Sequence, residues 1–433
     1  MSRRTARPFW ADDLPAYPGP AGNIPLDGTP DGVVALTLLH WREALRSRPL
    51  VYVARSDARA ERIARTLSAF GDRAVFLPGW DCQPYDRVSP SRGAMGMRIA
   101  ALHALQEPAG RVVVTTARAA MQRLPSRAEQ LQQGMIIAPG RALDESALRT
   151  FLRGRGYVLD DRVDEPGEAA FHGRTIDIFP GNAEFPVRIE CEDGLVKELR
   201  CYDPVLQRTL ASLEQLDLLP TDEALAATPA LSGELREALW DSERGTLRLG
   251  ASHWLPLFYR HRLATLFEIA GDVAVLIDAE VPAQVDEHDR RIADAFAFAA
   301  DLLRSERRQG SRTLSPLEPK RLYLERSEIE EALSDAVTFR LPADTSGKIG
   351  EHLPPLRANG RAGKARAFIG EQRAAGRRVL LAAEDEATRS ALIARLRLDV
   401  LGIEQLKQWS DAVELRAGTV ALLPEDLPQG FML

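Results

Sequence analysis

The sequence predicts an α/β protein that is divided into several domains. Its 433 residues exceed what one hydrophobic core supports, so about two to four domains are expected. The first third alternates short apolar runs with helical patterns, which is the order that gives a parallel, doubly wound sheet. Short strands separated by turn residues follow and predict a second, small α+β domain. A polar stretch then sets off a third, small α/β domain.

The first domain is expected to begin with residues 20–127. An apolar run at 49–54 predicts a strand, and Ser56 or Asp57 can cap the helix that follows it as far as residue 70. The alternation continues with a strand at 74–77, a helix at 92–105, a β-branched strand at 112–116 and a helix at 117–123. This βαβαβ order has the outline of one NTPase lobe.

The second, small α+β domain is expected over residues 128–220, with a helix at 144–155. Apolar and polar residues alternate in its strands, and the turn sequences Pro180-Gly181-Asn182 and Glu192-Asp193-Gly194 separate them. Strands are predicted at 157–159, 175–179, 187–191 and 196–202. The last three should form an antiparallel meander with one polar face.

Three further segments complete the predicted organisation. Residues 221–336 return to a mixed α/β pattern, whereas 343–363 are polar and rich in proline and glycine, as is typical of a linker. Residues 364–433 are expected to form a separate small α/β domain. The clearest elements of these segments are strands at 273–277, 378–382 and 420–423 and helices at about 286–308 and 384–397.

Composition excludes several classes of protein. With 45% hydrophobic and 27% charged residues the chain is typical of globular proteins, and no run of about 18 apolar residues predicts a membrane span. The N-terminus lacks the apolar core of a signal peptide, so a cytoplasmic location and no membrane contact are expected. A net charge of −6 argues against a large surface for nucleic-acid phosphates, and three scattered cysteines argue against disulfides or a zinc site. A protein partner is the better expectation.

The sequence also argues against nucleotide chemistry. A P-loop needs glycines that bring backbone N–H groups onto phosphates and a lysine that reaches the outer phosphate oxygens. The chain has five lysines, and none precedes Lys197. The stretch 22–32, where a nucleotide loop would lie, reads GNIPLDGTPDG and has no Gly-Lys-Ser/Thr. We therefore expect no cofactor, no bound metal and no enzymatic activity.

Three landmarks in order along the chain carry a resemblance to a known family. They are the strand and turn pattern of 165–209, the stretch WDCQPYDRVSP at 80–90, and the runs WLPLF at 254–258 and LATLF at 263–267. The first is similar to the second domain of UvrB. All three resemble the UvrB-like region of the transcription-repair coupling factors, the Mfd family, and a weaker likeness runs from about residue 30 to the end.

The resemblance implies a fold and a role. Residues 20–127 and 221–336 would form one degenerate, non-hydrolysing P-loop-NTPase-like lobe, and 128–220 would be an inserted domain like the second domain of UvrB that docks to UvrA. The chain would then be a non-catalytic adaptor in transcription-coupled nucleotide excision repair. RNA polymerase and DNA would be contacted only through family domains absent from this chain, which is itself expected to be a monomer.

The resemblance also assigns four residues to the UvrA-docking surface. Arg188 stands where the family has an arginine used for this contact, and a guanidinium group offers planar, multi-donor binding to carboxylates. His172 replaces a usual arginine, for which Arg174 can partly substitute. Glu192 falls where an apolar or aromatic contact is common, and an unpaired carboxylate there would weaken binding. Arg188 has a second interpretation, a solvated strand residue paired with Glu190, Glu192 or another acidic neighbour.

Two alternative functions stay open at this point. In the first, the chain is a structural or autoregulatory module that has lost UvrA binding, as the departures at His172 and Glu192 suggest, and it restrains an attached motor by packing on it. In the second, the first lobe retains nucleotide or nucleic-acid binding, which the missing P-loop glycines and lysine disfavour.

Overall fold

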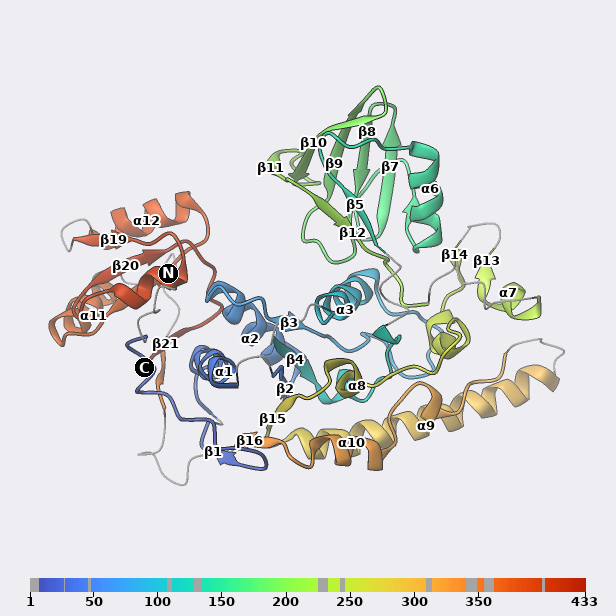
Figure 1. Cartoon of the computed structure of the whole chain (residues 1–433), viewed down its shortest axis with the longest axis horizontal. Helices are drawn as coiled ribbons and strands as arrows, with labels where there is room; N and C mark the ends of the chain where they lie inside the picture. Colours follow the sequence, from blue (N-terminus) through green and yellow to red (C-terminus); the bar gives the residue numbers. More distant parts are fainter. Residues whose placement is uncertain are drawn as a thin grey trace.

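The computed structural model describes residues 8–26, 28–45, 48–106, 111–127, 134–224, 233–241, 246–308, 314–339, 349–353, 362–398 and 402–433. A first lobe with a central sheet lies in the middle of the molecule (Figure 1). The inserted domain stands above helix α3, the long helix α9 runs along the opposite side, and the C-terminal segment lies beside the lobe near the N-terminus (Figure 1).

The described residues of the first lobe form a six-stranded sheet in which every neighbouring pair is parallel. In spatial order its strands are β1 (Asn23–Ile24), β16 (Val337–Phe339), β15 (Ala274–Asp278), β2 (Leu50–Ala54), β4 (Val112–Thr116) and β3 (Val75–Phe76). Parallel neighbours need crossover connections, which the helices supply. The predicted α/β class with a parallel sheet is confirmed, and β15 and β16 bring the chain back to this sheet after the insert.

Helices cover both faces of this sheet. Leu50 and Tyr52 of β2 belong to one core, whereas Val51 and Val53 belong to the core on the opposite face, because side chains alternate along a strand. The first face is covered by α1 (Asp31–Leu45) and α2 (Asp57–Ala69), and the second by α3 (Arg92–Ala104), α4 (Ala117–Ala120), α8 (Leu266–Ala270), α9 (Val281–Arg308) and α10 (Arg326–Leu333). Burial on both faces explains why β2 and β4 are almost continuously apolar.

The strands and helices predicted in the first third are confirmed to within a few residues, but one helix is missed. Ser56 caps α2 as predicted, since its hydroxyl accepts the Arg59 N–H at 3.3 Å. Helix α1 was not predicted, because its sequence DGVVALTLLHWREAL is apolar on nearly every side up to Trp41. A helix buried all round has no amphipathic period to reveal it.

The inserted domain is a six-stranded sheet with one helix on it. The sheet has the order β11-β10-β9-β8-β7-β6, antiparallel except for β6 and β7. The elements are β5 (Met135–Ile137), α6 (Glu145–Gly154), β6 (Val158–Leu159), β7 (Glu168–His172), β8 (Thr175–Ile178), β9 (Val187–Glu192), β10 (Leu195–Tyr202), β11 (Thr209–Ser212) and β12 (Leu216–Leu218). The predicted antiparallel meander is confirmed in β8, β9 and β10.

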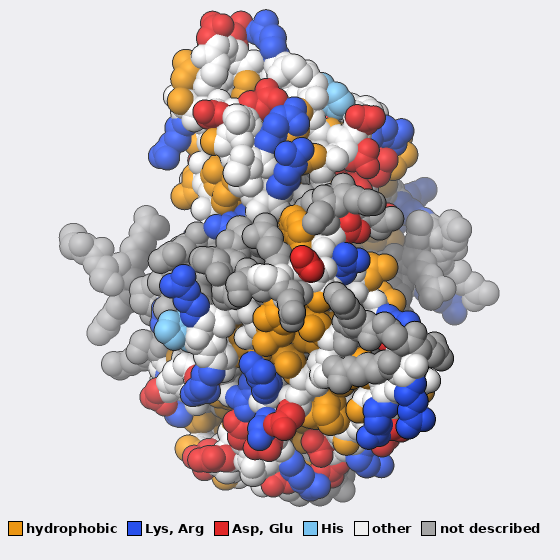
Figure 2. Space-filling model, turned by 90° about the vertical axis from the view of Figure 1, so that its right-hand side faces the viewer, with side chains coloured by type: hydrophobic (Ala, Val, Ile, Leu, Met, Phe, Trp, Pro, Cys, Tyr) orange, Lys and Arg blue, Asp and Glu red, His pale blue; other side chains and the backbone are white. Residues whose placement is uncertain are grey.

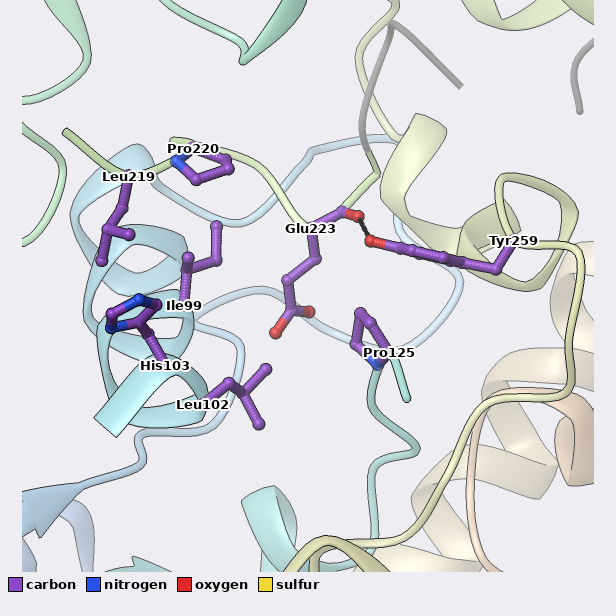
Figure 3. Close-up of a pocket in the computed structure, with 8 residues that line it drawn as sticks. All are labelled: Ile99, Leu102, His103, Pro125, Leu219, Pro220, Glu223 and Tyr259. Carbon is purple, nitrogen blue, oxygen red and sulfur yellow. Dashed lines mark hydrogen bonds between the residues drawn. The ribbon is translucent and has the colours of Figure 1, made fainter. Parts of the chain in front are cut away.

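A fully buried ion pair fastens the base of the inserted domain to the lobe. Arg98 of α3 donates from Nε to Glu223 at 2.9 Å, and neither side chain is exposed. The indole N–H of Trp80 donates to the other Glu223 oxygen at 3.2 Å, and the Tyr259 hydroxyl donates to the Glu223 backbone carbonyl. Figure 3 shows Glu223 between α3 on one side and Tyr259 on the other, in a small pocket lined also by Ile99, Leu102, His103, Pro125, Leu219 and Pro220.

A contact between two glycines brings the inserted domain directly onto α3. A Cβ atom placed on Gly96 would lie 2.1 Å from the carbonyl carbon of Gly181, which belongs to the turn between β8 and β9. Only a residue without a side chain permits such an approach at Gly96. Trp80 itself is almost fully buried, as expected of a core residue.

The C-terminal segment packs against the first lobe. The Trp409 ring centre lies 4.1 Å from that of Phe70 and 5.2 Å from that of Trp10, and Phe431 covers Gly32 at the start of α1. The elements are β17 (Glu351–Leu353), α11 (Ala362–Ala374), β18 (Val379–Ala382), α12 (Glu386–Leu396), β19 (Ile403–Gln405), η5 (Trp409–Glu414), β20 (Val420–Leu423) and β21 (Gly430–Met432). Strands β18, β20 and β19 form a parallel sheet, and β21 pairs with β17.

Most of the predicted linker lies outside the described residues. Within 343–363 the structure describes 349–353 and 362–363, which include β17 and the start of α11. The remaining short elements of the lobe are α7 (Glu234–Leu239), β13 (Trp240–Asp241), β14 (Thr246–Leu247), η1 (Ala251–Leu257) and η2 (Pro319–Arg321). Within the ranges that the structure describes, no helix is long and apolar enough to cross a membrane.

Glu223→Ala is expected to lower the free energy of unfolding by about 3–5 kcal/mol, because it leaves the Arg98 guanidinium buried without a carboxylate. Urea denaturation followed by tryptophan fluorescence measures the effect. The control Asp426→Ala breaks the exposed pair between Arg65 and Asp426, 2.8 Å apart, and should cost no more than about 1 kcal/mol. Equal shifts in the two variants would contradict this account of the buried pair.

Candidate protein-docking surface

The inserted sheet has one buried face and one open face. Ile176, Ile189 and Leu199 point into the core that the sheet shares with α6, β5 and β12. The alternate residues lie on the more open face, where strand pairing aligns the row Ala170, Asp177, Arg188 and Arg200 beside the row His172, Thr175, Glu190 and Glu198. Ala170, which packs with Val163 and Phe179, and Asp177 are buried on this face. We call the polar residues of these rows, together with Arg174, Glu192 and Lys197 at the end of the sheet, the charged face.

Arg188 is held in one orientation by its neighbours on the charged face. Its Nε and Nη2 atoms donate to the two carboxylate oxygens of Asp177 at 2.8 Å each, and Nη2 also lies 3.3 Å from the side-chain oxygen of Gln207. The guanidinium carbon lies 4.5 Å from the centre of the Tyr202 ring. These hydrogen bonds raise the pKa of Arg188 further above its ordinary value. A third of the side chain, 33%, stays exposed, so the surface presents a fixed and permanently charged donor.

The other three predicted residues lie at the end of the charged face. His172 is exposed at the end of β7, opposite Thr175. Arg174 Nη2 lies 2.5 Å from one carboxylate oxygen of Glu192, and Lys197 Nζ lies 3.4 Å from the other. The hydrogen bonds from Arg174 and then Lys197 lower the pKa of Glu192. Glu192 is therefore ionised and already paired, which reduces the penalty expected for a carboxylate at this position.

Positive and negative groups balance on the charged face. Arg174, Arg188, Lys197 and Arg200 make four cations, and Asp177, Glu190, Glu192 and Glu198 make four anions. Both signs are interspersed over the inserted domain, at the top of the view in Figure 2. A partner would therefore be recognised by the positions of individual charges and donors rather than by a net positive field.

An ordered loop beside Arg188 exposes apolar side chains. Val205 and Leu206, between β10 and β11, are 87% and 64% exposed, and Leu210 on β11 is 48% exposed. The Asp203 carboxylate accepts the backbone N–H groups of Val205 and Leu206 at 2.8 and 2.9 Å, which fixes the loop. We call Val205, Leu206 and Leu210 the apolar loop, and Gln207 connects it to Arg188.

Sequence reasoning identified Arg188 but not the groups that hold it. The second interpretation of Arg188, a strand residue paired with Glu190, Glu192 or another acidic neighbour, holds for its pairing, and the acidic neighbour is Asp177. A signal was present, because Asp177 and Arg188 both occupy polar positions of adjacent alternating strands. The apolar loop gave no such signal, since exposure of a leucine or valine in a turn depends on the folded chain.

The stretch 22–32, apart from Asp27, which lies outside the described residues, forms β1 and the start of α1. Asp31 in the first turn of α1 accepts from Arg59 Nη1 at 2.8 Å and from Arg62 Nε at 2.7 Å. Arg59 also contacts Tyr52 and Asp278 inside the lobe. The Asp31 carboxylate thus occupies the first turn of α1, and Arg59 and Arg62 neutralise its charge.

Comparison with known proteins finds the same resemblance for the inserted domain. The family model of the UvrB interaction domain matches residues 135–223. The transcription-repair-coupling factor of Escherichia coli (strain K12) is 29% identical over 366 residues, which cover 80% of this chain and 30% of that protein. The corresponding protein of Haemophilus influenzae is 27% identical over an alignment of 460 positions, which covers 98% of this chain and 38% of that protein.

The likeness extends to UvrB itself over a shorter part of the chain. The UvrABC system protein B of Mycoplasma pneumoniae is 26% identical over 219 residues, which cover 45% of this chain and 33% of that protein. The chain thus spans roughly a third of the length of the coupling factors it matches, 30% and 38% in the two examples above. The resemblance predicted from the sequence is confirmed: residues 135–223 match the family model of the UvrB interaction domain, and the chain is similar to part of the transcription-repair-coupling factors.

Proposed function

We propose that this chain is a non-catalytic adaptor in transcription-coupled nucleotide excision repair, and that it docks a UvrA-type partner through the charged face of its inserted domain. The observation that carries the proposal is Arg188, held by Asp177 and Tyr202 on the open face of the domain that matches the UvrB interaction domain. An arginine already fixed in place loses little conformational freedom when it binds a carboxylate of the partner.

The apolar loop supplies the second part of the proposed interface. Interfaces derive most of their affinity from a few apolar or arginine anchors that become fully desolvated, surrounded by polar contacts. Val205 and Leu206 are exposed, and the Asp203 turn holds them in place beside Gln207 and Arg188. Burial of a leucine side chain contributes about 1.5–3 kcal/mol, which exceeds the contribution of an exposed ion pair.

The proposed absence of catalysis rests on the first turn of α1. A phosphate-binding loop leaves backbone N–H groups at a helix N-terminus open to the ligand. Here Asp31 occupies this turn with Arg59 and Arg62 bound to it, and Phe431 covers Gly32. A phosphate would have to displace a buried carboxylate from two arginines, which disfavours nucleotide binding in this position.

A structural or autoregulatory module remains the second candidate function. The packing of Trp409 and Phe431 on the first lobe favours it, because these contacts join the C-terminal segment to the lobe through the buried Trp409 and the partly buried Phe431. Such a module would fold as described here and would not bind UvrA. A direct binding measurement separates the two proposals.

Arg188→Ala is expected to weaken binding to the cognate UvrA at least tenfold, about 1.4 kcal/mol, because it removes the fixed donor and leaves Asp177 buried without its partner. Isothermal titration calorimetry measures the affinity. Arg162→Ala is the matched control, since Arg162 is an exposed arginine of the same domain that pairs with Asp164. Its affinity should stay within about twofold of the unaltered chain.

Two results would count against the proposal. If circular dichroism shows that the Arg188→Ala variant and the unaltered chain are both folded, equal affinities would show that the interface does not lie on the charged face. A folded, unaltered chain that gives no binding heat with UvrA would favour the structural module instead.

Leu206→Asp is expected to accelerate dissociation from UvrA by about tenfold, because a carboxylate would enter the apolar centre of the interface. Surface plasmon resonance measures the dissociation rate. Leu249→Asp is the control, because Leu249 is 77% exposed on the first lobe, outside the inserted domain. Equal dissociation rates for the two variants would show that the apolar loop lies outside the interface.

A further inference from the structure

A crevice opens at the carboxyl ends of the lobe strands, and its lining includes no residue of the inserted domain or of the first turn of α1. Its volume is about 160 Å³, and its walls come from the start of α2, the end of β4, the start of α4 and helix α9. The residues that line it are Arg55, Ser56, Asp57, Thr116, Ala117, Arg118, Gln284, Glu287, His288 and Arg291.

The crevice lies at the position where parallel α/β sheets bind ligands. Strands β2 and β15 are neighbours, but α2, which follows β2, packs on one face of the sheet, and α9, which follows β15, packs on the other. Helices that leave adjacent strands toward opposite faces open a crevice outside the carboxyl ends of those strands. The lining residues come from the segment between β2 and the start of α2, from the end of β4 and the start of α4, and from one face of the first three turns of α9.

Arginines and a helix N-terminus give this crevice a positive character. Arg55, Arg118 and Arg291 line it, and Ser56 and Asp57 belong to the N-terminus of α2, where backbone N–H groups favour an anion. On α9, four lining residues recur at the spacing of one helical face: Gln284, Glu287, His288 and Arg291.

The crevice also holds a buried polar group that lacks a partner. His288 is 7% exposed, and its Nε2 atom has no hydrogen-bond partner among the described residues. Burial, followed by the nearby Arg118 and Arg291 guanidinium groups, lowers the pKa of His288 to about 4. A buried imidazole without a partner is costly, so a ligand atom that accepts or donates a hydrogen bond here would be stabilised.

The acidic residues of the crevice do not prevent anion binding. Asp57 is bound by Arg118 at 2.8 Å and by the Thr116 hydroxyl at 3.1 Å, and Glu287 pairs with Arg291 one turn away on α9. These side chains are substantially exposed, and exposed pairs are worth about 0–1 kcal/mol. A doubly charged anion could therefore take over arginine contacts at little cost.

We propose that this crevice binds a phosphate group through Arg118, Arg291 and His288. Guanidinium groups match the geometry of phosphate with two parallel hydrogen bonds, and the crevice can hold a phosphate with part of the molecule that carries it. The phosphate could be free, could belong to a nucleotide, or could be one of a nucleic-acid strand. The proposal is independent of UvrA docking, because no crevice residue belongs to the inserted domain.

Calorimetric titration of the full chain with inorganic phosphate, AMP and a short single-stranded oligonucleotide, at constant ionic strength, tests the proposal. Saturable binding is expected, and Arg118→Gln combined with Arg291→Gln should weaken it at least tenfold. Arg290→Gln combined with Arg304→Gln removes the same charge from exposed positions of α9 outside the crevice lining and should change affinity less than twofold. Tighter binding of the oligonucleotide than of phosphate would identify a nucleic-acid source.

Two outcomes would overturn the proposal. One is the absence of saturable binding for all three probes with a folded chain. The other is an equal loss of affinity in the crevice variant and in the α9 control, which would indicate an adventitious ion held by charge alone. If the double crevice variant does not fold, the single Arg291→Gln variant decides, since this exposed side chain pairs only with Glu287 among the ion pairs of the described residues.

Discussion

The placement of the inserted domain depends on a charge pair that water does not reach. Arg98 and Glu223 lie on segments far apart in the sequence, and their side chains are fully buried where the chain passes from the inserted domain back into the lobe. Removal of two charges from water is costly and is repaid only by good geometry and further hydrogen bonds. Trp80, Pro78 and Tyr259 supply those bonds, so the pair forms only when the lobe and the base of the insert meet in one way.

The same principle operates at the proposed docking surface, but at the protein exterior. Asp177 is almost buried and fixes Arg188, while the outer side of the guanidinium stays in contact with solvent. Because cations and anions balance across the charged face, long-range attraction contributes little and specificity depends on matching positions. The apolar loop would then supply apolar contact area, which the charged face itself does not provide. This combination would suit the proposed adaptor, which would have to distinguish its partner from other proteins.

Elements with a clear period could be predicted from the sequence, and elements defined by long-range burial could not. An apolar run predicts strand β4, alternation of apolar and polar residues predicts the meander of the inserted domain, and Ser56 indicates the start of α2. Helix α1 gave no amphipathic pattern because it is covered on nearly all sides. The pair of Arg98 and Glu223 joins residues 125 positions apart, which no local pattern reveals.

The candidate site shows the same division. The resemblance placed Arg188, His172, Arg174 and Glu192 on the inserted domain, and the structure brings Arg174 and Glu192 into contact with each other but not with Arg188. Asp177 could have been inferred from strand alternation alone. The exposure of Val205 and Leu206 and the crevice beside His288 depend on how distant segments pack, and these features required the folded chain.

The most direct test of the central claim is hydrogen-exchange mass spectrometry of the full chain with and without its cognate UvrA. The account predicts that UvrA slows exchange in β8, β9 and β10 and in the loop that carries Val205 and Leu206, and leaves the lobe helices α1 and α9 unchanged. Formation of a complex that protects the lobe or the C-terminal segment, but not the inserted domain, would contradict the assignment of the charged face as the docking surface.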